Sequence, residues 1–184
     1  MDDENRLLLS GENWDAFVGH LEESKNRKPS RALVGLMELE PFQNGNKMNA
    51  SETLQPLIAS ATEAYYHAYA PYSRFSVGAA VLDEHGTIHS GCNVENAAYP
   101  SGSCAEEQAI GTMVAQGGRR IREIVIVGRS DAPVTPCGAC RQRIREFGDA
   151  QTQIHVVDLD RGLQRSYTVE ELLPEAFGPE NLEN

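Results

Sequence analysis

The sequence lacks the features with which a chain enters or crosses a membrane. It has no run of about 18 consecutive apolar residues, the length that a membrane-spanning helix requires. Its first residues, Met1 to Glu4, are acidic, whereas a secretory signal begins with basic residues and continues with an apolar stretch. We therefore expect a soluble, cytoplasmic protein without a membrane partner.

Disulfide-forming cysteine and positive charge are also scarce. The four cysteines could form two disulfides, but a Cys-x-x-Cys pair in a chain without an export signal favours reduced thiols that bind metal. The chain has 16 Lys and Arg against 27 Asp and Glu, a formal net charge of −11 at pH 7. Proteins bind nucleic acid mainly through Lys and Arg set against phosphates, so this charge argues against a nucleic-acid partner.

Three of the four cysteines stand in two short motifs. Cys104 precedes Ala105 and Glu106, and Cys137 and Cys140 follow about thirty residues later. Both motifs open expected helices, where free N–H groups and the positive helix end stabilise thiolates. Three thiolates suit one Zn²⁺ and leave its fourth tetrahedral position open for water, whereas a structural zinc normally has four protein ligands. Glu106 is placed to take a proton from that water.

Other interpretations of these motifs stay open from the residues alone. Ser103 followed three residues later by Glu106 also fits a helix capping box. A closed structural zinc site is a further alternative, with Cys92 or one of the five histidines as the fourth ligand. Thiolate ligands and tetrahedral geometry favour zinc without excluding another soft metal.

The chain divides into two parts by pattern. We expect residues 1–48 to be an N-terminal extension of unknown role and residues 49–184 to be the functional domain. In the domain the apolar spacing and turn residues predict the following elements: a helix from Ser51 that ends before Pro71, a hairpin of strands at 76–82 and 87–93, a helix from Cys104 to Gly117, a strand at 121–127, a helix at 137–147, a strand at 154–157, and a helix at 170–173 behind a Thr168 and Glu171 capping box. This order predicts an α/β fold with a mixed sheet and helices on both faces.

Residues 51–182 contain several blocks that resemble one known family in the same order. The blocks are APYSRFSVGAA at 70–80, GCNVENAAYP at 91–100, CAE at 104–106, PCGACRQ at 136–142, and LLP to FGP within 172–179. In these blocks the chain resembles the small, homotetrameric, three-cysteine type of cytidine deaminase. The resemblance implies a three-layer α/β/α fold with a mixed five-stranded sheet. It also implies one Zn²⁺ per chain on Cys104, Cys137 and Cys140, with Glu106 as the catalytic residue.

The resemblance further assigns residues to a nucleoside substrate. Asn93 and Glu95 would hold the ribose 3′-hydroxyl group, Phe75 would pack against the pyrimidine, and the backbone of Ala105 would contact the base. Ordinary structural roles remain open for these residues, because Asn93 and Glu95 alternate as on a polar strand edge and Phe75 suits a core or an interface.

Active sites shared between subunits are a second implication of the resemblance. Phe177 would reach the base from a neighbouring subunit, and Ala97 and Tyr99 would meet the 5′ side of a nucleoside in an adjacent subunit. A homotetramer would then be required for function. Phe177 also suits an ordinary interface, and Tyr99 before Pro100 also suits a plain turn.

One residue departs from the family pattern. Members commonly carry arginine directly after the catalytic glutamate, where it neutralises thiolate charge, and this chain has Glu107. A second acid makes ionisation of the attacking water harder and predicts a higher pH optimum, unless Arg141 or Arg74 compensates.

The expected activity is zinc-dependent hydrolytic deamination of cytidine and 2′-deoxycytidine to uridine and 2′-deoxyuridine, in pyrimidine salvage. Glu107 leaves two alternatives open. One is a deaminase of a related aminated nucleoside, such as a nucleoside antibiotic, and the other is a zinc-stabilised binding module without turnover.

Overall fold

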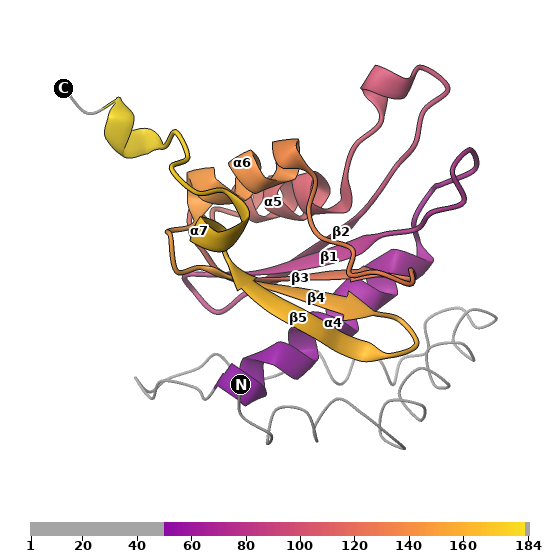
Figure 1. Cartoon of the computed structure of the whole chain (residues 1–184), viewed down its shortest axis with the longest axis horizontal. Coiled ribbons are helices and arrows are strands. Elements are labelled where there is room, and N and C mark those ends of the chain that lie inside the picture. Colours follow the sequence, from indigo (N-terminus) through magenta and orange to yellow (C-terminus); the bar gives the residue numbers. More distant parts are fainter. Residues whose placement is uncertain (1–49, 183–184) are drawn as a thin grey trace. The chain divides into compact units, whose positions relative to one another are not determined.

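The computed structural model describes residues 50–182 of the chain. The expected extension, residues 1–48, lies outside the described residues, and the division of the chain at 48/49 stays a prediction. Leu54–Asn184 form a compact unit of their own. Figure 1 shows a central sheet with helices on both of its faces.

The centre of this unit is a five-stranded mixed sheet with the strand order β2-β1-β3-β4-β5. β3 and β4 are parallel, and the other neighbouring pairs are antiparallel. The strands are β1 (Gly78–Asp83), β2 (Ile88–Cys92), β3 (Ile121–Gly128), β4 (Gln153–Asp158) and β5 (Gly162–Thr168).

One face of the sheet is covered by α4 (Ala50–Tyr66). The helix forms where the apolar spacing predicts it, and Leu57, Ile58 and Ala61 are fully buried. Its backbone approaches β1 so closely at Gly78 that an added Cβ would lie 2.9 Å from the Cα atom of Tyr65. Only glycine fits there, so Gly78 sets the distance between α4 and the sheet.

The opposite face is covered by α5 (Ala105–Ala115) and α6 (Gly138–Phe147). Alternate strand residues point at these helices because successive side chains of a strand face opposite sides. The core between them includes Ala79, Val81, Ile124, Ile126 and Ile154 from the strands and Ala109, Met113 and Ile144 from the helices. The three-layer α/β/α fold is therefore confirmed. Within residues 50–182, every helix is too short or too polar to cross a bilayer.

β5 is the strand that residue patterns alone did not predict. Most of its residues are only half-buried and several are polar, so the alternation of apolar and polar residues is weak on this edge strand. The element that follows was predicted correctly. α7 (Val169–Leu172) begins with a capping box, in which the Thr168 side chain accepts from the Glu171 backbone and the Glu171 side chain accepts from the Thr168 backbone.

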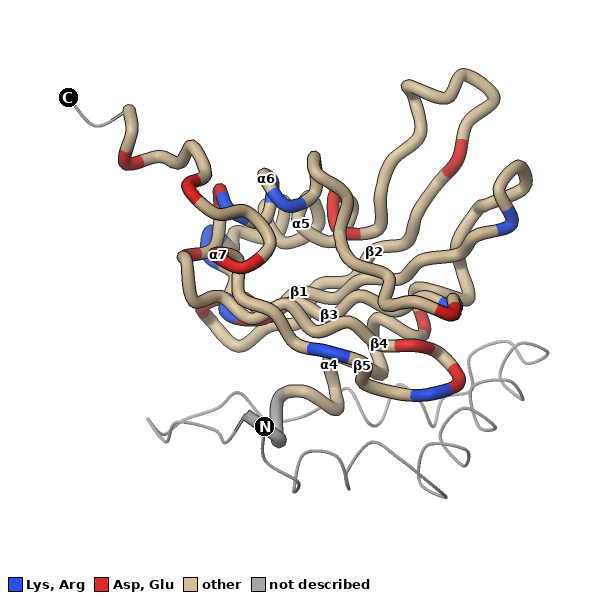
Figure 2. Tube along the Cα trace, viewed as in Figure 1, with Lys and Arg blue, Asp and Glu red and all other residues tan. Residues whose placement is uncertain are grey.

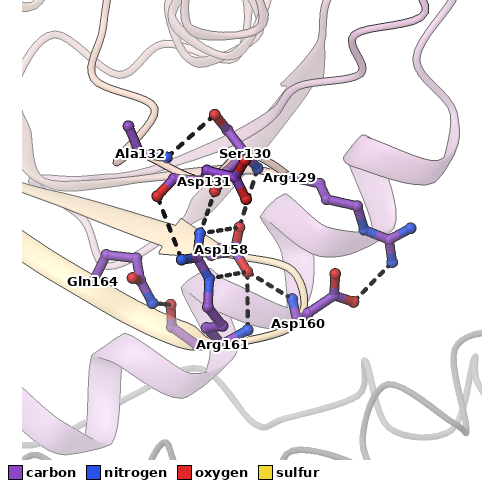
Figure 3. A network of polar contacts seen from close by, with 9 residues as sticks. Arg129, Ser130, Asp131, Ala132, Asp158, Asp160, Arg161 and Gln164 are labelled. Carbon is purple, nitrogen blue, oxygen red and sulfur yellow. Dashed lines mark hydrogen bonds and ion pairs between the residues drawn. The ribbon is translucent and has the colours of Figure 1, made fainter.

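A polar network holds the turn between β4 and β5 against the end of β3 (Figure 3). Asp158 is buried and accepts hydrogen bonds from the backbone N–H groups of Ser130, Asp160 and Arg161. Burial raises the pKa of Asp158, but the side-chain hydrogen bond from Arg161 and these backbone donors outweigh it and hold the pKa below its ordinary value. The charged residues of this network therefore have a structural role, because they hold the turn between β4 and β5 in place.

β2 touches α5 at Gly91, directly behind the start of the helix. A Cβ there would lie 2.6 Å from Cβ of Gln108 and 2.8 Å from the carbonyl oxygen of Ala105. We expect Gly91→Ala to push α5 outward and to lower the free energy of unfolding by about 1–3 kcal/mol, as overpacking does. The matched control is Gly111→Ala in α5, where a Cβ meets open space and the change is neutral or stabilises by about 0.4–1 kcal/mol. Urea unfolding separates the two, and equal stability of both variants would contradict the close contact.

Candidate functional site

Three cysteines meet where α5 and α6 begin. Cys104 is the N-cap of α5, Cys137 is the N-cap of α6, and Cys140 lies buried in the first turn of α6. Their Sγ atoms all lie within 4.8 Å of one another, and those of Cys104 and Cys137 are 3.9 Å apart. A tetrahedral zinc with bonds of about 2.3 Å places its sulfur ligands about 3.8 Å apart. The trio is therefore close to the arrangement that one zinc ion requires.

The three thiols differ in how readily they ionise. Burial raises the pKa of Cys140, and burial followed by the charge of Glu106 raises the pKa of Cys104. Burial also acts on Cys137, but hydrogen bonds from the Cys140 backbone and from the other two thiols outweigh it, so the pKa of Cys137 lies below its ordinary value. Cys137 is thus the thiol that ionises first, and a bound cation is needed to keep all three as thiolates.

The capping-box interpretation of Ser103 and Glu106 is wrong. The N-cap of α5 is Cys104, and no side chain caps this helix end. Ser103 instead accepts a hydrogen bond from Nε2 of Gln108 at 2.7 Å. Glu106 is therefore not occupied in capping the helix.

The closed, four-ligand interpretation receives no fourth ligand from the described part of the chain. Among residues 50–182, the group of candidate metal ligands consists of the three cysteines, with neither Cys92 nor a histidine added. Cys92 is half-buried at the end of β2, and burial raises the pKa of its thiol. A three-ligand site with one open position is the arrangement that a hydrolytic zinc requires.

Glu106 lies in the first turn of α5 and is only 5% exposed. Burial raises the pKa of Glu106, against the smaller lowering effects of hydrogen bonds from its own backbone and Cys140 and of the positive charge of Arg143. The neighbouring Glu107 adds a small upward shift. A carboxyl group with a raised pKa holds a proton more readily than an ordinary one and can still release it, so Glu106 is suited to acid and base catalysis.

A cavity of about 650 Å³ opens in front of these groups. Glu106, Cys104 and Cys137 border it, whereas Cys140 lies behind them in the core. The cavity also collects five of the residues that the sequence assigns to the substrate, namely Phe75, Asn93, Glu95, Tyr99 and Ala105. Two others, Ala97 and Phe177, are not among its lining residues.

Asn93 and Glu95 fasten the loop that carries Phe75. Oδ1 of Asn93 accepts from the Val77 backbone at 2.8 Å, and its Nδ2 donates to the Phe75 carbonyl at 2.9 Å. Oε2 of Glu95 accepts from the backbone N–H groups of Tyr72 at 2.8 Å and Ser73 at 3.2 Å. A hydrogen bond from the Ser73 side chain is the largest of the effects that lower the pKa of Glu95. These two residues therefore shape the cavity wall, which the residue patterns did not indicate.

Sequence reasoning missed other residues of the cavity wall. Tyr72 and Ser73 border it from the loop before β1, and Val134 and Thr135 border it from the segment before Pro136. Tyr72 and Ser73 lie inside the sequence block at 70–80, and Val134 and Thr135 lie directly before the block at 136–142. This closeness to the blocks could have indicated them. The Tyr72 and Tyr99 rings meet edge to face with centroids 6.4 Å apart, so two distant loops join at the edge of the cavity.

The charges beside the cysteines are arranged differently from the expectation. Arg141 donates from Nε to the Pro136 carbonyl at 2.9 Å and from Nη1 to the Leu172 carbonyl at 3.0 Å, so it supports the segment before Cys137. Glu107 instead forms an ion pair with Arg143, with 3.1 Å between Oε1 and Nη2. Figure 2 shows the acidic start of α5 beside basic residues of α6. Sequence reasoning missed Arg143, although its place three residues after Cys140 puts it on the same side of α6.

Comparison with known proteins gives concordant results. Residues 51–156 match the family model described as the cytidine and deoxycytidylate deaminase zinc-binding region. The chain is 43% identical over 129 residues to a cytidine deaminase of Sporosarcina psychrophila, which covers 70% of this chain and 94% of the relative. It is also 43% identical over 128 residues to a cytidine deaminase of Halalkalibacterium halodurans, which covers 70% of this chain and 96% of the relative.

The fold agrees with a solved structure of the same kind. The crystal structure of a cytidine deaminase from Burkholderia pseudomallei is similar with a TM-score of 0.64 and 39% identity, over 71% of this chain and 100% of that chain. The sequence blocks, the cysteine trio and the sheet thus lead to one conclusion: the chain belongs to the cytidine deaminase family.

Proposed function

We propose that this protein catalyses the zinc-dependent hydrolytic deamination of cytidine and 2′-deoxycytidine to uridine and 2′-deoxyuridine, with release of ammonia, in pyrimidine salvage. The observation that carries the proposal is the position of Glu106, a buried carboxyl group beside three clustered thiols at the wall of a cavity of about 650 Å³. Relatives at 43% identity that are named cytidine deaminases support it.

The cysteine trio fits zinc by donor type and by spacing, so Cys104, Cys137 and Cys140 would hold the ion. Bound zinc supplies a Lewis acid that activates a water molecule. Glu106 accepts one proton from the attacking water and delivers it to ring nitrogen N3, which offsets the loss of conjugation as oxygen bonds to C4. Glu106 then transfers the second water proton to the amine, the C4–N bond breaks, ammonia leaves and the carbonyl forms.

The substrate residues are proposed on the same basis. Phe75 is 40% exposed at the cavity wall and offers an aromatic face to a pyrimidine. Asn93 and Glu95 border the cavity with polar groups suited to the ribose 3′-hydroxyl, and the Ala105 backbone lies beside Glu106 for contact with the base. Because Asn93 and Glu95 also hold the Phe75 loop, we expect ribose contact and ring contact to depend on each other.

An ultraviolet assay of protein with measured metal content tests the proposal. Cytidine and 2′-deoxycytidine are supplied separately, and ammonia release is measured alongside the spectral change to the uracil nucleoside. Turnover of either nucleoside supports the proposal. Turnover restricted to another aminated nucleoside would move the assignment to that substrate, and bound zinc without turnover of any amine would support a binding module.

We further propose that the active sites are shared in a homotetramer. Phe177 is 59% exposed and is held on α6 through its carbonyl, which accepts from Nε2 of Gln142 at 2.9 Å. It does not line the cavity of its own chain, and Ala97 does not either. A large exposed aromatic side chain on a fastened segment suits contact with a second copy. Tyr99, at 79% exposure, borders its own cavity, and so large an exposed ring would also suit contact with a neighbouring subunit.

A mixing experiment tests this sharing. We expect Phe177→Ala and Glu106→Gln to be nearly inactive when pure, because each removes a different part of the same composite site. Subunits of the two variants that are dissociated together and reassembled should regain part of the wild-type rate, since some sites then combine an intact Glu106 with an intact Phe177. Mixing without dissociation is the control. A reassembled mixture as inactive as its parents would contradict the shared site.

The remaining proposals concern the cellular location of the protein and the molecule that it binds. A site that requires three reduced thiols suits the reducing cytoplasm, and all four cysteines of the chain are free. The net charge of −11 favours a small nucleoside over a polynucleotide as the partner.

A further inference from the structure

The ion pair between Glu107 and Arg143 joins the two helices that begin at the cysteine trio. Glu107 follows Cys104 by three residues on α5, and Arg143 follows Cys140 by three residues on α6. Residues three apart lie on the same side of a helix, so each charged residue lies about one helical turn from a cysteine at the start of its own helix. The bond of 3.1 Å between Nη2 of Arg143 and Oε1 of Glu107 therefore joins the two helices within about one turn of the cysteines.

The charges around the loaded site are unbalanced. Three thiolates on one Zn²⁺ carry one negative charge more than the metal neutralises. Glu106 and Glu107 in the first turn of α5 add further acidic groups. Arg141 directs its guanidinium at the carbonyl oxygens of Pro136 and Leu172. Arg143 pairs with Glu107, and its positive charge also acts on Glu106.

We propose that Arg143 is a positioning residue that compensates for the acidic Glu107 and thereby stabilises the zinc-loaded site. The inference rests on the proposed function for the presence of zinc. Without Arg143 the unpaired carboxylate of Glu107 repels a centre that is already negative, and the loaded site becomes less stable. Without Glu107, Arg143 keeps its positive charge, and the negatively charged zinc-loaded site does not repel it. The two partners of one ion pair thus have unequal roles.

Competition for zinc with a chromophoric chelator at fixed pH tests whether Arg143 and Glu107 contribute unequally to zinc retention. We expect Arg143→Gln to lose zinc at a chelator concentration about twofold to fivefold lower than wild type does, the range for an ion pair that is more than a third exposed. Glu107→Gln should hold zinc as well as wild type or better, and the double variant should return close to wild type. Arg143→Lys should keep most of the retention because it keeps the charge.

The matched control is Arg145→Gln on the same helix. Arg145 pairs with Glu180 of the C-terminal segment, so its replacement removes the same charge without touching the acidic cluster. It should leave zinc retention unchanged, and thermal unfolding checks that each variant is folded. In turnover, Arg143→Gln should lower kcat with an unchanged KM, because Arg143 does not line the cavity.

Specific outcomes overturn the proposal. If Glu107→Gln and Arg143→Gln lose zinc equally, the ion pair only holds the two helices together. If Arg145→Gln loses as much zinc as Arg143→Gln, the loss follows from removing any positive charge from α6 and not from the contact with Glu107. Zinc-loaded wild-type protein that deaminates no nucleoside would overturn the proposed function alone, because chelator competition needs no substrate. Wild-type protein that binds no zinc would overturn both.

Discussion

Glu106→Gln is expected to lower kcat by at least about 10²-fold to 10⁴-fold, the contribution of a general acid and base, while the protein retains zinc. Glutamine has nearly the same shape as glutamate but carries no titratable proton. Glu106 is 5% exposed and its pKa is raised by burial, so the neutral side chain removes an unfavourable buried charge. The unfolding temperature should therefore stay equal or rise. Metal content, thermal unfolding and the ultraviolet assay measure the three expectations.

The control for this variant is Glu146→Gln on α6, which replaces an exposed carboxylate with the same amide and should keep wild-type turnover. Loss of zinc from Glu106→Gln would mean that the carboxylate acts as a ligand. Full turnover by Glu106→Gln would remove the proton transfer from the mechanism and leave the metal alone to account for the rate.

Cys137→Ala is expected to reduce zinc from about one ion per chain to almost none and to abolish turnover. Cys137 is exposed and is the thiol whose pKa is lowered, so its replacement leaves no buried void but removes the ligand that ionises most readily. Zinc added at about 1,000 times its dissociation constant stabilises a protein that binds it only when folded by about 4 kcal/mol. Wild type should show the corresponding rise in unfolding temperature, and Cys137→Ala should not.

Cys92→Ala is the matched control, because Cys92 is a free cysteine at the end of β2 that is not part of the cysteine trio. It should keep about one zinc per chain. Zinc loss from Cys92→Ala would restore the closed four-ligand alternative, and zinc retained in Cys137→Ala would show that two cysteines suffice. Elemental analysis after dialysis distinguishes these outcomes without any substrate.

The outcome of the fold prediction follows the strength of each local pattern. α4, α5, α6 and the hairpin of β1 and β2 appear where periodicity and turn residues predict them, because the helices present an apolar face to the sheet and β1 is a short apolar run buried on both faces. The capping box before α7 was correct because both of its hydrogen bonds are local. β5 was not found from residue patterns because an edge strand with polar, half-buried residues is stabilised by pairing with β4 rather than by its own composition.

For the candidate site as well, the sequence predicted the features that depend on local residues and missed those that depend on tertiary contacts. The motifs of Cys104, Cys137 and Cys140 and the presence of Glu106 predicted the zinc chemistry, because residue type and position at a helix start are local features. The meeting of the two helix starts depends on the packing of α5 and α6 on one sheet. The Ser103 capping alternative is decided by the N-cap of α5, which is visible only in three dimensions. The sequence identifies Glu107 as an excess acid and suggests Arg141 or Arg74 as the compensating cation, whereas the structure pairs Glu107 with Arg143.

By itself the sequence determined the helices, the cysteine motifs, the acidic character and the reaction class, since each depends on residue type and on spacing along one segment. The tertiary structure decided which distant segments meet. It fastens the Phe75 loop with Asn93 and Glu95, brings Arg143 of α6 to Glu107 of α5, and leaves Phe177 outside its own cavity. Such contacts join residues far apart in the chain. The ion pair, for example, depends on the packing of α5 and α6 on one sheet, and no local pattern encodes that packing.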